Sequence, residues 1–242
     1  MSTLETKKIE PLSGTSVTLG AAGDAVTMPA GVTVKTNTVK DAGGNTLWTS
    51  DGSGTLSSVN SALQGNMIFI SSQTVSAAVA NINFTSGINS TYDEYMFIFT
   101  NISPSSNHVN FTFNASTDGG SNYNVTKTTT AWRSYHLESG SSALQYQTGW
   151  DLAQSASDQQ LMNELGDDAD MSGSGILHLF TPASTTYVKH FYSRSAEYYG
   201  GNGAFDVFIA GYLNTTSAIN ALTFKISSGN IDAGTIALYG IK

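Results

Sequence analysis

The most restrictive feature of this sequence is a series of short β-type runs that begins at Asn66 and continues to the C-terminus. In His108–Ala115 (HVNFTFNA), Val109, Phe111 and Phe113 alternate with polar residues, and a period of two is typical of a half-buried strand. Runs that predict further strands are Met67–Ile70, Val75–Phe84, Tyr95–Ile102 (YMFIFTNI), Val125–Leu137, Gly175–Phe180, Tyr187–Arg194, Phe205–Leu213, Ala221–Ile226 and Thr235–Ile241.

Roughly nine strands with short turns predict an all-β fold, an antiparallel β-sandwich that is jelly-roll-like and forms a head domain over residues 61–242. Asp118–Ser121 (DGGS) predicts a hairpin turn, because glycine accepts the positive φ that such turns require. The one helix-compatible stretch is Ser157–Leu165, where Leu161 and Leu165 are spaced as on one face of a helix. A short helix within a loop is therefore expected there.

Residues 1–60 have a different texture, with Trp48 as their one aromatic side chain. The triplets Val17–Leu19, Val26–Met28 and Val32–Val34 are separated by glycine and proline, so each predicts a short strand between turns. Strands this thin cannot bury an apolar face alone, much as single repeats cannot. Residues 1–60 are therefore expected to intertwine with the same segment of identical chains in a homotrimer. They are also expected to anchor the protein on other proteins of the same assembly. The alternative is a partly ordered tail.

Charge and composition exclude several classes of protein. The net charge is −8 with 10 Lys and Arg residues against 18 Asp and Glu, so no basic face is expected that would bind nucleic acid. The chain has no cysteine, which removes disulfides and thiolate metal sites. It contains no apolar run long enough for a membrane helix or a signal peptide, so we expect no membrane insertion.

No motif points to catalysis, and the chain is expected not to be an enzyme and to use no cofactor. Nucleophile elbows, phosphate-binding loops and dinucleotide fingerprints are absent from the sequence, and the four histidines lie in separate predicted strands. Asp168, Asp170 and Ser172 match the opening positions of a calcium loop. The match then fails, because Leu179 occupies the position of the bidentate glutamate. A solvated acidic loop is the alternative.

Aromatic residues in polar loops give the candidate binding site. Trp150 follows a Gln-rich stretch, and Tyr198 and Tyr199 precede Gly200–Gly203. Sugar rings present C–H faces that stack on aromatic planes, and loops on a rigid scaffold commonly carry binding residues. These three rings are therefore candidate ligand-binding residues for a host-surface glycan, with packing against protein as the alternative.

Several stretches resemble a group of structural proteins common in marine tailed bacteriophages, described as tail-fibre, head-fibre or appendage-like. The stretches that carry the resemblance are Gly23–Val34, Tyr92–Tyr95 (YDEY), Asn101–Pro104 (NISP), Val109–Phe111, Asp118–Thr130 (DGGSNYNVTKTTT), Phe224–Ile236 (FKISSGNIDAGTI) and Leu238–Ile241 (LYGI).

This resemblance implies a non-enzymatic virion component, assembled in the host cytoplasm, that docks on other virion proteins through residues 1–60 and exposes the rest. The head domain is expected to contribute to attachment of the virion to the host surface. The alternative is a capsid decoration or tail-hub protein that contacts only other virion proteins.

Overall fold

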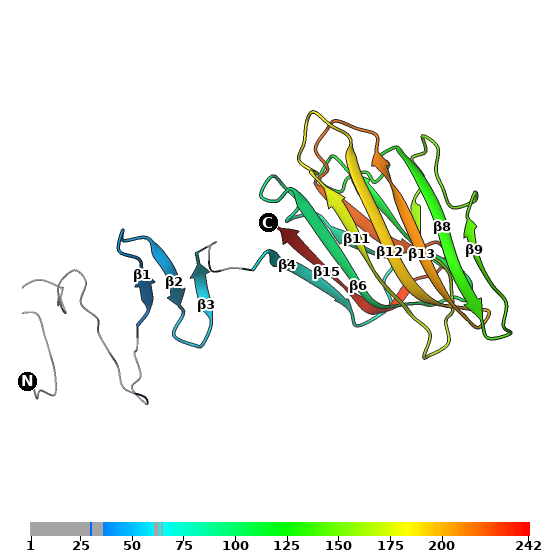
Figure 1. Cartoon of the computed structure of the whole chain (residues 1–242), viewed down its shortest axis with the longest axis horizontal. Helices are drawn as coiled ribbons and strands as arrows, with labels where there is room; N and C mark the ends of the chain where they lie inside the picture. The colour runs from blue at the N-terminus through cyan, green and yellow to red at the C-terminus, as the bar shows by residue number, and fades with distance from the viewer. Residues whose placement is uncertain (1–29, 31–35, 61–62, 64) are drawn as a thin grey trace, which may run out of the picture. The chain divides into compact units, whose positions relative to one another are not determined.

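The computed structural model describes residues 30, 36–60, 63 and 65–242, and it divides into two compact units, Met1–Leu63 and Gln64–Lys242 (Figure 1). In the first unit, β1 (Thr38–Lys40), β2 (Thr46–Ser50) and β3 (Leu56–Val59) form an antiparallel sheet in that order. The three predicted triplets between residues 17 and 34 lie outside the described residues.

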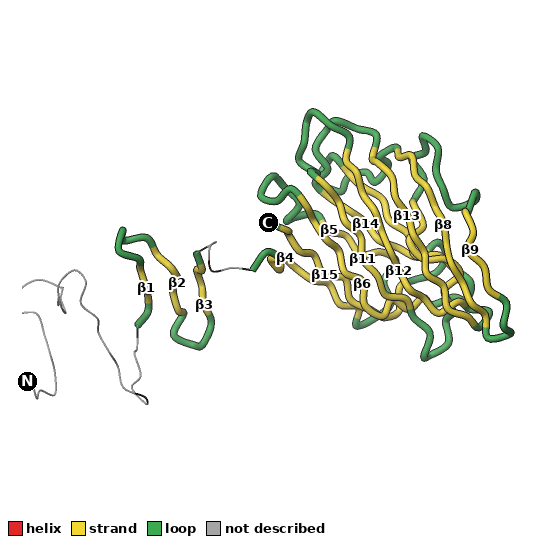
Figure 2. The backbone as a smooth tube through the Cα atoms, in the orientation of Figure 1, coloured by secondary structure: helices red, strands yellow, loops and turns green. Residues whose placement is uncertain are grey.

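The second unit is a twelve-stranded antiparallel sheet that folds back on itself and nearly closes (Figure 2). The all-β antiparallel prediction is confirmed, and no α-helix occurs in the part of the chain that the structure describes. The strands are β4 (Met67–Val75), β5 (Asn81–Phe84), β6 (Glu94–Pro104), β7 (Val109–Ser116), β8 (Lys127–Leu137), β9 (Ser142–Tyr146), β10 (Gln159–Leu165), β11 (Gly173–Phe180), β12 (Lys189–Tyr199), β13 (Gly203–Leu213), β14 (Ala221–Ile226) and β15 (Ile231–Ile241).

The strands form one hydrogen-bonded sheet that curves round the core, so that two runs of strands face each other, and we call these runs the large layer and the small layer. The large layer has the order β4-β15-β6-β11-β12-β13-β8-β9, and the small layer has the order β10-β7-β14-β5. The layers are joined where β10 pairs with β12 through Leu165 and Tyr199. Strands β12 and β13 pair along their whole length, as do β13 and β8. These three long strands extend the large layer beyond β11.

The core lies between the two layers and is rich in phenylalanine. Phe97 and Phe99 point from β6 toward the small layer, where their rings lie 5.3 Å and 5.2 Å from Phe224 of β14. Farther along, Phe113 of β7 makes an edge contact with Phe191 of β12 at 5.0 Å. All five rings are almost fully buried, because successive strand residues point to opposite faces and these occupy the inward positions.

The helix predicted at Ser157–Leu165 is wrong, since residues 159–165 form strand β10. The pairing of β10 with β7 has irregularities between Gln160 and Met162 and again between Met162 and Leu165. Such irregularities disturb the strict alternation of a strand. Leu161, Met162 and Leu165 are all buried as a result, and their spacing imitates a helical face.

The hairpin predicted at Asp118–Ser121 is also wrong, although both of its glycines have the predicted positive φ, 74° at Gly119 and 91° at Gly120. Strand β7 pairs with β10 and β14, so the chain crosses to the large layer here and does not return along β7. Asp118 organises the crossing, since its carboxylate accepts hydrogen bonds from Ser116 Oγ and Asn122 N. These bonds lower the pKa of Asp118 to about 2.

Candidate functional site

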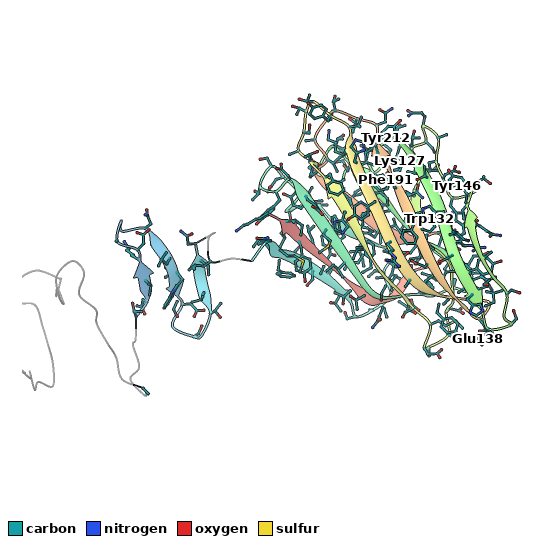
Figure 3. The ribbon with its side chains drawn as sticks, viewed as in Figure 1. Lys127, Trp132, Glu138, Tyr146, Phe191 and Tyr212 are labelled. Carbon is teal, nitrogen blue, oxygen red and sulfur yellow. The ribbon has the colours of Figure 1, made fainter. Side chains whose placement is uncertain are left out.

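Aromatic side chains cover the outer surface of the large layer. In β12 the odd-numbered residues from Lys189 to Glu197 are buried and the even-numbered ones are exposed, so the even positions face outward. Register then places the outward residues of neighbouring strands side by side. We call this surface the aromatic face and define it by Trp132, Tyr146, His178, Phe180, His190, Tyr192, Phe208 and Tyr212. Figure 3 shows Trp132 and Tyr146 beside each other, with Trp132 between Tyr212 and Glu138.

The centre of the aromatic face is a stack of flat groups. Trp132 of β8 lies parallel to Phe208 of β13, with ring centroids 3.8 Å apart and planes 4° apart. The Arg194 guanidinium covers the same phenylalanine, 4.8 Å from its centroid. Two hydrogen bonds from Arg194 to the Asp206 carboxylate, of 3.0 Å and 2.9 Å, fix the guanidinium in place. This bidentate contact makes the stack a preformed platform.

A hollow of about 420 Å³ lies beside the platform, toward the start of β12. Its walls are the rings of Phe180, His190, Tyr192 and Tyr212, and small residues of β13 form its floor. Tyr192 is braced by His178, which stacks on it at 4.6 Å and contacts Glu94 Oε1 through Nδ1 at 2.5 Å. Hydroxyls of Thr128 and Thr130 stand on the opposite side of this hollow. The hollow therefore combines ring planes with hydroxyl groups.

On the other side of the platform, two hollows of about 840 Å³ and 580 Å³ adjoin and form one trough. They share four residues, His136, Ser174, Ala196 and Ala204. The last three of these have small side chains. Arg194 and Asp206 stand at one end of the trough. At the other end the Tyr198 hydroxyl donates to Glu138 Oε1 at 3.1 Å, which raises the pKa of Tyr198.

The three aromatic residues predicted for ligand binding do not share one surface. Tyr198 lines the trough on the outer face. Its neighbour Tyr199 packs against the core and stacks on Phe205 at 4.5 Å, because successive strand residues alternate in direction. Trp150 also packs against the core, where the Arg133 guanidinium lies 4.9 Å from its ring. The structure therefore leaves Tyr198 on the outer surface of the large layer, in the trough, and places the other two against the core.

The sequence did not predict most of the aromatic face, because the binding rings were expected in loops and these rings lie on strands. A usable signal lies in Tyr187–Arg194, where Phe191 stands between His190 and Tyr192. Successive side chains of a strand point to opposite faces, so when neighbouring positions both carry rings, one of the two rings must face outward. Register among β8, β9, β11, β12 and β13 was also needed, and it depends on pairs that are distant in the sequence.

The calcium candidates Asp168, Asp170 and Ser172 lie in the connection between β10 and β11. Both aspartates are exposed, and the backbone of this loop is closed by a hydrogen bond from Met171 N to Asp168 O of 2.9 Å. Among the residues that the structure describes, no group of three or more His, Asp or Glu side chains is arranged to hold a metal ion.

The aromatic face is suited to binding a flat, hydroxyl-rich molecule. Ring planes offer apolar contact to C–H groups, and nearby side chains can pair with hydroxyls. The Arg194–Asp206 ion pair and the His178–Glu94 contact are both made within the protein.

No helix of the described residues is long and apolar enough to cross a membrane. No protein-family model, curated protein or solved structure matches the chain.

Proposed function

We propose that this chain is a bacteriophage virion fibre or appendage protein, without enzymatic activity, whose head binds a host-surface glycan through the aromatic face. The observation that carries the proposal is the platform of Trp132, Phe208 and Arg194, with a hollow on each side of it. A ligand that lay across the platform would meet the edges of its stacked rings in the middle, the ring of Tyr192 in the hollow on one side, and the polar groups of the trough on the other.

We further propose that the head is a jelly-roll sandwich with two insertions. If β4, β5, β6, β7, β10, β11, β14 and β15 are lettered B to I, the strand orders read B-I-D-G and C-H-E-F. This is the connectivity of jelly rolls, a fold that occurs in viral capsid and lectin domains. The inserted strands are β8 with β9 and β12 with β13. Most of the aromatic face lies on them, which is consistent with a binding surface added to a structural fold.

Residues 1–60 are proposed to dock on other virion proteins and to join three copies of the chain. Light scattering of the full chain is expected to give the mass of a trimer, and a chain that starts at Ser61 is expected to dissociate at protein concentrations at which the full chain is still trimeric. The shortened chain retains the complete unit Gln64–Lys242 with its own core, so loss of folding is not expected to confuse the result. Monomers in both measurements would contradict the proposed trimer.

Tyr192→Ala and Trp132→Ala are each expected to weaken glycan binding by about 2 kcal/mol, or roughly 30-fold in affinity, as for central aromatic anchors of an interface. Both side chains are about two-fifths exposed, 42% and 38%, so neither substitution opens a cavity in the core. The measurement is binding of labelled full-length protein to bacterial cells, before and after periodate cleavage of the sugar diols on their surface.

Tyr187→Ala is the matched control, because Tyr187 is 71% exposed and lies outside the aromatic face. Its binding is expected to equal that of the wild type. Binding that survives periodate treatment, or that is unchanged in Tyr192→Ala and Trp132→Ala, would contradict the glycan proposal.

A second candidate function is a capsid decoration or tail-hub protein that contacts only other virion proteins. It is favoured by apolar side chains near the two margins of the large layer, since Phe69 of β4 is 57% exposed and Leu144 of β9 is 70% exposed. Exposed apolar groups on strands at the edge of a sheet suit a protein partner. This candidate predicts that the purified protein binds empty virus particles and ignores cells.

A further inference from the structure

A lysine and an asparagine lie in direct contact where β7, β8 and β10 approach one another. Lys127 opens β8 and Asn114 lies near the end of β7, and both residues are almost fully buried, at 0% and 1% exposure. Lys127 Nζ is 2.9 Å from Asn114 Oδ1. An amine and a carboxamide held together and away from water are the two reactants of amide exchange, and proximity of this kind lowers the barrier to reaction.

Every polar atom of the Asn114 side chain has a partner, so its orientation is fixed. Oδ1 accepts hydrogen bonds from Lys127 Nζ and from Ala115 N, the second at 2.9 Å. Nδ2 donates to Ala156 O at 3.0 Å and to Asp158 Oδ1 at 2.9 Å. The backbone amide therefore polarises the carbonyl, and a carboxylate lies against the nitrogen that would leave.

We propose that Lys127 and Asn114 join in an isopeptide bond within the chain, with Asp158 as the catalytic residue that carries the proton. This inference does not depend on the proposed function, because it rests on contacts away from the aromatic face. The product is an amide between Lys127 Nζ and Asn114 Cγ, and the by-product is one molecule of ammonia.

The atoms and electrons of this step balance without any oxidant or external reactant. The lone pair of neutral Lys127 Nζ attacks Asn114 Cγ, and the carbonyl electrons move onto Oδ1, where Ala115 N–H stabilises the charge. Asp158 takes a proton from the attacking nitrogen and delivers it to Asn114 Nδ2. The carbonyl re-forms, the Cγ–Nδ2 bond breaks, and Nδ2 leaves as ammonia.

Burial also favours the reactive form of the lysine. Removal from water lowers the pKa of Lys127 to about 8, against the opposing effect of the Asp158 charge. A neutral fraction is therefore present near neutral pH, as an amine nucleophile requires. Asp158 is itself held by Lys225, whose Nζ lies 2.6 Å from Oδ2, so the carboxylate is kept in position beside Asn114.

A second buried lysine shows what the reactive pair has that other lysines lack. Lys189 is also 0% exposed, and its Nζ donates at 3.1 Å to Tyr187 O and to Thr215 O. Lys127 Nζ also donates to a backbone carbonyl, Ser157 O at 2.7 Å. Both of these partners of Lys189 are backbone carbonyls, which cannot release ammonia. Lys189→Arg is therefore the matched control variant for a substitution of a buried lysine.

The test is the intact mass of the purified full chain. The wild type and Lys189→Arg are expected to be lighter than their sequences by one ammonia. Asp158→Asn and Lys127→Arg are expected to have their full sequence masses, with far-UV circular dichroism confirming that they fold. Trypsin locates the bond, because cleavage after Lys127 should be lost and a fragment 41–133, lighter by one ammonia, should replace fragment 41–127.

Three outcomes would overturn the proposal. The first is a wild-type chain that keeps its full sequence mass after long incubation. The second is an unchanged loss of ammonia in Asp158→Asn, which would remove the assigned catalytic residue. The third is a loss that maps to the fragment containing Asn202 and Gly203, since an Asn-Gly sequence can lose ammonia through a cyclic imide without any lysine.

Discussion

Phe224→Ala is expected to destabilise the unit Gln64–Lys242 by about 3–5 kcal/mol, the range for deletion of a buried phenylalanine ring. The Phe224 ring is a hub between the layers. Its centroid lies 5.2–6.4 Å from those of five other rings: Phe84, Phe97, Phe99, Phe111 and Phe113. These five rings come from three strands, β5, β6 and β7, which belong to both layers, so local collapse cannot fill the cavity. Urea unfolding followed by tryptophan fluorescence measures the loss, which is a large part of a typical domain's total stability.

Phe69→Ala is the control for this substitution. Phe69 is 57% exposed and contacts one ring, that of Tyr239 at 5.6 Å. Its truncation is expected to change the free energy of unfolding by no more than about 0.5 kcal/mol, as for most surface positions. Equal losses in the two variants would contradict the assignment of Phe224 to the centre of the core.

Glu197→Gln is expected to stabilise the protein at neutral pH. Glu197 is buried in β12 and accepts a hydrogen bond from Asn163 N of 2.9 Å, while its Oε2 atom has no hydrogen-bond partner within the described part of the chain. Burial raises the pKa of Glu197 well above 4.5, although the Asn163 hydrogen bond and the charge of Arg133 oppose the shift. A glutamine keeps the accepting oxygen and removes the charge.

The sign of the pH dependence follows from proton linkage. Below pH 4.5 both folded and unfolded chains carry a protonated Glu197, and its contribution to stability is fully present. Above that pH the unfolded chain ionises first. Stability then falls by up to about 1.4 kcal/mol per pH unit until the folded pKa is reached.

Urea unfolding of the wild type and of Glu197→Gln should therefore agree near pH 4 and diverge as the pH rises, with the variant more stable. Asp232→Asn serves as the control for loss of one exposed carboxylate, and it should keep the slope of the wild type. A Glu197→Gln variant that is less stable than the wild type at pH 7 would show that the buried carboxylate is ionised and favourably paired.

Most strands of the head could be predicted, because their alternation expresses which side chains are buried. His108–Ala115 shows this directly, since Phe111 and Phe113 are inside. Strand β9 was missed because its sequence, SALQY, is short and does not alternate between apolar and polar residues. Strand β10 was mistaken for a helix because its irregular pairing removes the alternation. Local sequence therefore identified strands whose apolar residues alternate, and it failed at β9 and β10, where they do not.

The candidate sites depended on information that the sequence does not display. Tyr198 and Tyr199 are adjacent in the chain, and the direction of their strand decides which of them faces outward. Asn114, Lys127 and Asp158 come together because the chain crosses from β7 to the large layer and later returns to β10. Residue types suggested aromatic recognition, whereas the arrangement of both sites required the pairing of distant strands.

The strand order also determines when the head can fold during synthesis. In the head, β4 pairs along its length with β15 alone and β5 with β14 alone, so the first two strands made depend on the last two. Pairs that are so distant in sequence form slowly, and they leave strand edges exposed in the meantime. A ribosome must therefore release residues 221–241 before β4 and β5 find their partners. Both layers therefore stay incomplete until the final strands have been made.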